Sequence, residues 1–330
     1  MNIKKIFNQL NIFAQCRRYG LSFWQCPQFL FLIMGIIIIV TSIVIYAIGN
    51  RYIADPEMVA LVVLFVSAIL FVIANIITQS FERVAEASRM KSEFVSIVSH
   101  QLRSPLSNLR WTNELLMSGK IDSITKKQLE YFQILKENID RMQKLVSDLL
   151  IVSRIETATL PLKKREISLE NLVKKLILDF KPLIEASNVK MELTAQENLP
   201  NVLIDPSQIR LVIENLTDNA IRYTPTDSHF KTDELVINRK EKGIVQMRIE
   251  KKNESIYFEI EDNGVGIPKE DQKYIFQKFF RSENILKYQT QGSGLGLYIA
   301  KAIIEKSGGK IGFKSKEGKG STFWFALPIK

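Results

Sequence analysis

The chain is poor in cysteine and histidine, with only two of each in 330 residues. Cys16 and Cys26 have no zinc-ligand spacing, and no run of basic residues with interleaved aromatics suggests a nucleic-acid surface. The cysteines are therefore interpreted as small apolar residues kept reduced. The net charge of +10 favours an anionic membrane surface as the partner over nucleic acid.

Two long apolar stretches lie near the N-terminus. Residues 29–48 and 58–78 carry no charged side chain, and each has about the 20 residues that cross a bilayer. We predict two transmembrane helices joined by a short extracytoplasmic loop at 49–57. The tail at 1–28 is basic and has no acidic residue, so the positive-inside rule places it, and everything after residue 78, in the cytoplasm. Apolar residues at helical spacing in this tail suggest a helix lying on membrane lipid, and a disordered basic tail is an equal alternative.

His100 lies in an otherwise helical segment, five residues before Pro105. At about 100° per residue, His100 falls roughly opposite an apolar stripe, so we expect it to face outward. A neutral imidazole nitrogen can attack an electrophile. The segment between Thr78 and His100 has no helix breaker, which predicts that the second span runs directly into this helix and leaves no room for a folded sensor. The stripe comprises Phe94, Val98, Leu102, Leu109 and Leu116.

A second helix is predicted after a break at Ser118–Lys120, with Asp122 or Ser123 as its N-cap. It carries a heptad seam, which needs a partner helix. Residues 79–156 therefore form an antiparallel hairpin, and two hairpins complete a homodimeric four-helix bundle. A monomeric hairpin packed on another domain is the alternative. The seam comprises Phe132, Leu135, Ile139, Met142, Val146 and Leu149.

Beyond a linker at 157–164 the chain changes to mixed helix and strand, predicting an α+β sandwich over residues 165–330. Helices are expected at 169–180, 206–222 and from the glycine loop at 292 to 306. Strands are expected at 188–193, 246–248, 256–260, 310–314 and 322–327. Residues 228–243, which contain His229, are interpreted as an insertion, most simply a surface hairpin.

Four clusters in the sandwich suggest nucleotide chemistry, and one of them, at residues 275–281, supplies aromatic packing. Asn215 and Asn219 lie one helical turn apart, and their amide oxygens suit Mg²⁺, while Arg222 can pair with phosphate. Asp262 is followed by glycines and can accept a hydrogen bond from an exocyclic amine such as that of adenine. The glycine run that begins at Gly292 precedes a helix whose free N–H groups suit phosphate.

The order and spacing of these motifs resemble the sensor histidine kinases of two-component systems over residues 85–330, with a layout similar to the intramembrane-sensing kinases. The resemblance implies a multidomain bacterial membrane protein whose sandwich is an ATP-binding domain of the GHKL (Bergerat) type. It implies ATP and Mg²⁺ as cofactors, autophosphorylation of His100, and transfer of the phosphoryl group to an aspartate of a separate response regulator. It also implies a multi-pass protein of the cytoplasmic membrane, sensing through its spans or through a partner membrane protein.

The resemblance also assigns the nucleotide site. Asn215 and Asn219 match the magnesium-binding asparagine box, and Asp262 matches the adenine-recognising aspartate. Lys287 lies in the expected lid at 280–291. The remaining nucleotide-binding candidates are Arg222, Tyr223, Gly264, Gly266, Gly292, Gly294, Leu295, Gly296 and Thr322.

The chain departs from the family at Gln101, where an acidic residue usually follows the histidine. Glutamine accepts a proton poorly, so autokinase activity is expected to be lower or the kinase–phosphatase balance to differ. Ser104 stands where the family often has a residue that positions water for dephosphorylation. A phosphatase-dominant or degenerate kinase, and a GHKL-type ATPase without phosphotransfer, therefore remain alternatives.

Overall fold

The computed structural model describes residues 27–53, 55–224, 243–282 and 292–329. The chain divides into two compact units, Met1–Leu160 (unit 1) and Pro161–Lys330 (unit 2). The basic tail up to residue 26, nearly all of the insertion with His229, and Lys287 with most of the expected lid lie outside the described residues.

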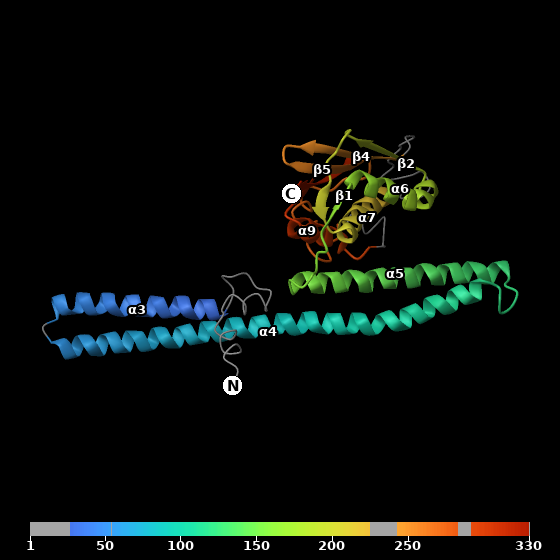
Figure 1. The fold of residues 1–330 in the computed structure, drawn as a ribbon. Coiled ribbons are helices and arrows are strands. Elements are labelled where there is room, and N and C mark those ends of the chain that lie inside the picture. Colours follow the sequence, from blue (N-terminus) through green and yellow to red (C-terminus); the bar gives the residue numbers. More distant parts are fainter. Residues whose placement is uncertain (1–26, 54, 225–242, 283–291, 330) are drawn as a thin grey trace. The chain divides into compact units, whose positions relative to one another are not determined.

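Unit 1 begins with two helices, α3 (Pro27–Tyr52) and α4 (Pro56–Met117), which run side by side in Figure 1. The segments Phe29–Tyr52 and Pro56–Val84 are long and apolar enough to cross a membrane. Val59 and Ala74 are buried between the helices. The predicted loop at 49–57 is largely helical, because α3 continues to Tyr52 and α4 starts at Pro56, where Asp55 caps the helix by accepting from the N–H of Glu57 at 3.0 Å.

The helix α4 has 62 residues and continues from the apolar segment through His100 to Met117. The prediction that the second span runs into the His100 helix is therefore confirmed. Pro105 lies inside α4 without ending it. Because proline has no N–H, the carbonyl of Gln101 lacks its helical donor there. The ribbon bends in its C-terminal half (Figure 1).

The helix α5 (Lys126–Glu156) returns along α4 to form the predicted hairpin. Its N-cap is Thr125, and the expectation of Asp122 or Ser123 was wrong. The Thr125 hydroxyl accepts from the N–H of Gln128 at 3.3 Å, and the Gln128 side chain accepts from the N–H of Thr125 at 2.9 Å. This reciprocal capping box satisfies two N–H groups, whereas Asp122 or Ser123 would have started the helix earlier.

The face of α4 that packs inside the hairpin differs from the expected apolar stripe. The buried residues recur every seven positions and are mostly polar or small, whereas Phe94 is 66% exposed and Leu109 49% exposed. On α5 the seam residues Ile139 and Val146 are buried, but Met142 remains 43% exposed. One hairpin therefore leaves much of its apolar surface uncovered. Within the hairpin, the buried α4 residues are Ser92, Ser99, Leu106 and Asn113.

Unit 2 is the predicted α+β sandwich. Its main sheet has the order β2-β4-β5-β7-β6, in which β2 is parallel to β4 and the other pairs are antiparallel. The helices lie on one side of this sheet (Figure 1). The strands are β2 (Val189–Ala195), β4 (Gly243–Lys252), β5 (Ser255–Asp262), β6 (Lys310–Lys316) and β7 (Gly320–Pro328), and the helices are α6 (Leu169–Ala186), α7 (Pro206–Arg222) and α9 (Gly296–Lys306).

Alternation along the strands builds the core. Val245, Met247 and Ile249 of β4 are buried, with exposed or half-buried residues between them, and Phe258 stacks on Phe325 at 4.9 Å between ring centres. The sequence missed a two-stranded sheet of β1 (Arg165–Ile167) and β3 (Val202–Ile204), because three-residue strands carry too little pattern. The helix α6 extends beyond its expected end at residue 180 and includes Pro182.

Candidate functional site

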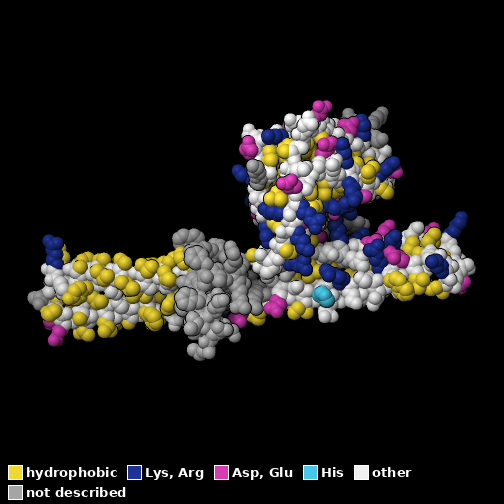
Figure 2. All heavy atoms as spheres, viewed as in Figure 1, with side chains coloured by type: hydrophobic (Ala, Val, Ile, Leu, Met, Phe, Trp, Pro, Cys, Tyr) yellow, Lys and Arg dark blue, Asp and Glu magenta, His cyan; other side chains and the backbone are white. Residues whose placement is uncertain are grey.

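His100 is exposed on the surface of α4, and the prediction that it faces outward is confirmed. Figure 2 shows a histidine at the surface of the hairpin. Its imidazole makes no hydrogen bond to any described residue, and neither does the side chain of Gln101 or Ser104, both of which are exposed. The nitrogen atoms of His100 are therefore accessible to an incoming electrophile.

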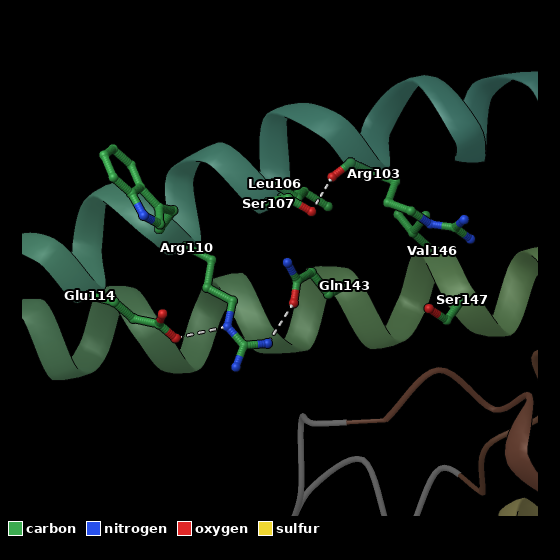
Figure 3. A pocket seen from close by; sticks show the side chains of 9 residues that line it. Arg103, Leu106, Ser107, Arg110, Glu114, Gln143, Val146 and Ser147 are labelled. Atoms are coloured by element: carbon green, nitrogen blue, oxygen red, sulfur yellow. Dashed lines mark hydrogen bonds and ion pairs between the residues drawn. The ribbon is translucent and has the colours of Figure 1, made fainter.

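A pocket of about 390 Å³ opens between α4 and α5, on the turns that follow His100. At about 100° per residue, its α4 residues fall within about 80° of His100, except Leu106, which is buried inside the hairpin. Figure 3 shows Arg110 reaching across it: Nε lies 2.9 Å from Oε1 of Glu114, and Nη1 donates to Oε1 of Gln143 at 3.4 Å. The guanidinium of Arg103 makes no hydrogen bond or ion pair within the described part of the chain. The other lining residues are Leu106, Ser107, Trp111, Val146 and Ser147.

In unit 2, α7 holds the two asparagines. It starts where Oδ1 of Asp205 accepts from the N–H groups of Ser207 at 2.9 Å and Gln208 at 3.2 Å. Asn215 is 5% exposed, and its Nδ2 donates to the carbonyl of Gly296 at 3.4 Å, which joins α7 to the start of α9. Among the described residues, the Asn219 side chain has no hydrogen-bond partner. Its amide is available to a ligand on the same face of the helix as Asn215.

Asp262 ends β5 and is 6% exposed. Its Oδ1 accepts from the N–H of Gly264 at 2.9 Å and from the N–H of Ser321 at 3.2 Å. No described residue hydrogen-bonds to Oδ2, which leaves this oxygen for a ligand. Burial raises the pKa of the carboxyl from 3.8 to about 7, although the two N–H groups act in the opposite direction.

Glycine is required in the segment after Asp262 because the backbone approaches other chain segments closely. A Cβ at Gly264 would lie 2.2 Å from the carbonyl oxygen of Tyr223, and one at Gly266 would lie 2.1 Å from that of Lys316. The N–H of Val265 donates to the carbonyl of Tyr223 at 3.0 Å. The backbone of Tyr223, at the C-terminal cap of α7, thus holds the Asp262 loop beside the asparagine helix.

The second glycine run packs against the segment at Phe279 and against the side chain of Asn215. Gly294 has φ of +67°, and a Cβ there would lie 2.7 Å from the carbonyl carbon of Phe279. The helix α9 (Gly296–Lys306) starts at the end of the glycine loop, while Leu295 is fully buried and Gly292 is exposed. Gly294 and Gly296 therefore lie where α9 begins, and Gly296 lies beside the side chain of Asn215.

The strand register does not bring the nucleotide candidate Thr322 to Asp262. Thr322 pairs with Glu261 and belongs to the face of the sheet opposite to Asp262, so its side chain is not brought to the carboxylate. Its neighbour Ser321 pairs with Asp262 and supplies a backbone N–H to it. No pattern in the sequence pointed to Ser321, because the strand register decides which residue meets Asp262.

Comparison with known proteins finds a family match in each of the two units. Residues 90–158 match the His Kinase A (phospho-acceptor) domain, and residues 204–330 match the histidine kinase-, DNA gyrase B- and HSP90-like ATPases. The chain belongs to the sensor histidine kinases. His100, Gln101 and Ser104 of this kinase lie in the first match, and Asn215, Asn219, Asp262 and the glycines lie in the second.

Relatives of this kinase include the sensor histidine kinase GacS of Pseudomonas protegens, 31% identical over 245 residues that cover 74% of this chain and 25% of the relative. The sensor histidine kinase WalK of Bacillus subtilis is 32% identical over 246 residues, covering 73% of this chain and 37% of WalK. The kinase thus spans between a quarter and two fifths of the length of these relatives. A solved structure of full-length ShkA in complex with AMPPNP has a TM-score of 0.57 and 25% identity, covering 72% of this chain and 46% of ShkA.

Proposed function

We propose that this histidine kinase transfers the γ-phosphoryl group of ATP to His100 and passes it to an aspartate of a separate response regulator. The observation that carries the proposal is the exposed, unbonded imidazole of His100 on a phospho-acceptor hairpin, in one chain with an ATPase-type cradle. An unprotonated ring nitrogen forms the N–P bond, the bond between the γ-phosphorus and its bridging oxygen breaks, and ADP leaves. The proton of the imidazole passes to water.

The cradle in unit 2 positions the nucleotide in this proposal. Oδ2 of Asp262 accepts from the adenine amine, and Arg222 pairs with phosphate. The backbone N–H groups at the start of α9 face the phosphates as well. The amide oxygens of Asn215 and Asn219 are the proposed protein ligands of Mg²⁺, which needs few protein groups beside the phosphates. Bound Mg²⁺ would neutralise phosphate charge.

A second copy of the chain covers the apolar face of the hairpin in our proposal. Several large side chains on α4 and α5 remain exposed, including Phe94, Leu102 and Leu135, at 66%, 44% and 43%. Burying such side chains contributes roughly 1.5–3 kcal/mol each. The homodimeric four-helix bundle expected from the heptad seam is therefore favoured over a lone hairpin.

The response regulator would approach His100 on the side where the pocket opens. Charged, polar and aromatic groups line that pocket within about four turns of His100, and Arg103 has a guanidinium without a partner among the described residues (Figure 3). The aspartate of the regulator then attacks phosphorus on phospho-His100, and the N–P bond breaks.

The cytoplasmic membrane of a bacterium is the proposed location. Two helices of sufficient length and apolarity, with exposed apolar side chains, support a multi-pass protein in contact with lipid. The stimulus would be sensed by these spans or by a partner membrane protein.

A phosphatase-dominant kinase is a second candidate function. It is favoured by Gln101 and by the exposed hydroxyl of Ser104, one helical turn C-terminal to His100.

Labelling with radioactive ATP and Mg²⁺ tests the proposal. We expect acid-labile, alkali-stable phosphate on the full chain and none on the His100→Gln variant. ATP hydrolysis without phosphoprotein would instead indicate a plain ATPase, and dephosphorylation of a regulator without labelling would indicate a phosphatase. Mixing His100→Gln with Asn219→Ala subunits gives label only if transfer crosses a dimer.

A further inference from the structure

An ion pair on α7 holds the proposed phosphate ligand Arg222, and its acidic member, Asp218, has no role in the function described so far. Nε of Arg222 lies 2.6 Å from Oδ1 of Asp218, and the two side chains are only 34% and 17% exposed. At about 100° per residue, both fall on the same face of the helix as Asn215 and Asn219. A carboxylate in this position is unexpected, because it repels the phosphates of a nucleotide.

The contact uses only one edge of the guanidinium. The terminal nitrogens of Arg222 have no hydrogen bond or ion pair to a described residue. These nitrogens carry the pair of donors that binds phosphate in two parallel hydrogen bonds. The carboxylate of Asp218 therefore restricts the side chain of Arg222 without occupying the atoms that would bind phosphate.

A second pair on the same helix shows the difference. Arg210 and Glu214 have the same spacing, with Nε 2.7 Å from Oε1, and Arg210 is 34% exposed, as Arg222 is, while Glu214 is 31% exposed. However, Nη2 of Arg210 is also bound, at 2.9 Å, by Asp179 of α6. This pair joins two helices and is accounted for by packing alone, whereas the Asp218–Arg222 pair leaves its donors unused.

We propose that Asp218 is a positioning residue that holds the Arg222 guanidinium ready for the phosphates of ATP. This inference rests on the proposed function. Fixing a flexible side chain before binding reduces the entropy lost when the ligand arrives. Asp218 thereby favours binding even though its own charge opposes it.

The two effects of Asp218 predict opposite results on substitution. Asp218→Asn removes a negative charge, so electrostatics alone predicts tighter binding of a triphosphate. Loss of positioning predicts weaker binding, and we expect AMPPNP to bind the full chain about tenfold more weakly, as for one lost hydrogen bond to a charged group. Adenosine, which lacks phosphate, should bind equally well and reports that the site is still folded.

The design includes three further variants measured with AMPPNP and adenosine by calorimetry. Glu214→Gln is the matched control, and its AMPPNP affinity should not change. Arg222→Lys keeps the charge but lacks Nε, so it should lose affinity like Asp218→Asn. Combining the two substitutions should cause little further loss, because both remove the same positioned group.

Unchanged or tighter AMPPNP binding by Asp218→Asn would overturn the inference, as would full additivity in the double variant. If Asp218→Asn also loses adenosine, Arg222→Lys decides the question, and equal AMPPNP affinity for Arg222→Lys and the unsubstituted chain would reject positioning. Failure of the unsubstituted chain to bind AMPPNP would overturn the proposed function, and the inference with it.

Discussion

The hydroxyl of Ser42 lies 2.8 Å from the hydroxyl of Ser67 and links the two apolar helices of unit 1. Each hydroxyl also lies 2.7 Å from a carbonyl in its own helix, that of Ile38 or Val63. Because a serine hydroxyl has one proton, only two of these three hydrogen bonds can form at once. The link between the helices thus competes with bonds inside each helix.

We predict a small but measurable coupling between Ser42 and Ser67. A double-mutant cycle of Ser42→Ala and Ser67→Ala should give about 0.6 kcal/mol, because a freed hydroxyl returns to its own helix. The measurement is energy transfer between labels on α3 and the apolar part of α4, in lipid bicelles. Thr78→Val is the control, since its hydroxyl bonds only to the carbonyl of Ala74, at 2.8 Å. Zero coupling in the cycle would contradict the prediction.

Gln101 should limit the autokinase rate. An amide side chain cannot take up the imidazole proton, whereas a carboxylate can, and general bases contribute about 10² or more to rates. Gln101→Glu is therefore expected to raise the initial rate of His100 labelling by about 10-fold to 100-fold. Gln101→Ala should not raise it. Equal rates for the glutamate variant and the unsubstituted chain would show that water accepts the proton without assistance.

Nucleotide binding should depend on pH near neutrality through Asp262. With a pKa of about 7, the carboxyl gains a proton as the pH falls and loses its capacity as an acceptor for the adenine amine. If only the deprotonated carboxyl binds the nucleotide, the affinity is about tenfold lower at one pH unit below the pKa, because about one tenth of the carboxyl is deprotonated there. We expect AMPPNP to bind about tenfold more weakly at pH 6 than at pH 8, and Asp262→Asn to bind weakly at both. A flat profile for the unsubstituted chain would contradict this assignment.

The same carboxyl should affect the stability of unit 2 in the opposite sense. Its folded-state pKa of about 7 exceeds the ordinary 3.8, so the folded state holds more protons than the unfolded state between these values. The free energy of unfolding contributed by Asp262 is therefore greatest below about pH 4 and declines as the pH rises to about 7. Comparing proteolysis rates of the full chain and Asp262→Asn across this range measures the difference, which should be largest near pH 7.

Gly294 and Gly318 form a matched pair for testing the glycine requirement. Their φ angles are +67° and +73°, but a Cβ at Gly294 would lie 2.7 Å from a backbone carbon, whereas one at Gly318 would meet no atom within 4 Å. Alanine at either position costs roughly 1–2 kcal/mol from the backbone conformation alone. Gly294→Ala should additionally displace Phe279 and abolish AMPPNP binding, while Gly318→Ala retains it. Similar binding by both variants would show that the clash is relieved cheaply.

The sequence predicted the elements that are long or that carry characteristic boundary residues and spacings. The boundaries of α7 followed from Pro206 and Arg222, and the outward position of His100 followed from helical phase. Spacing also indicated that Asn215 and Asn219 share a face. The part that could not be predicted depends on contacts between segments. Strand register brings Ser321 rather than Thr322 to Asp262, and the packing of α5 selects Ser99 and Leu106 over the more apolar stripe.

Because α4 is one uninterrupted helix, its length fixes the angle around the helix axis at which His100 faces relative to the apolar helix pair. Adding one residue between Thr78 and Ser92 would turn His100 by about 100° around the axis, while adding seven would return it to within about 20°. Signal output across a series of insertions should therefore rise and fall with the helical repeat instead of declining with length. In this kinase, the number of residues between the apolar segment and His100 sets the angle at which the histidine faces.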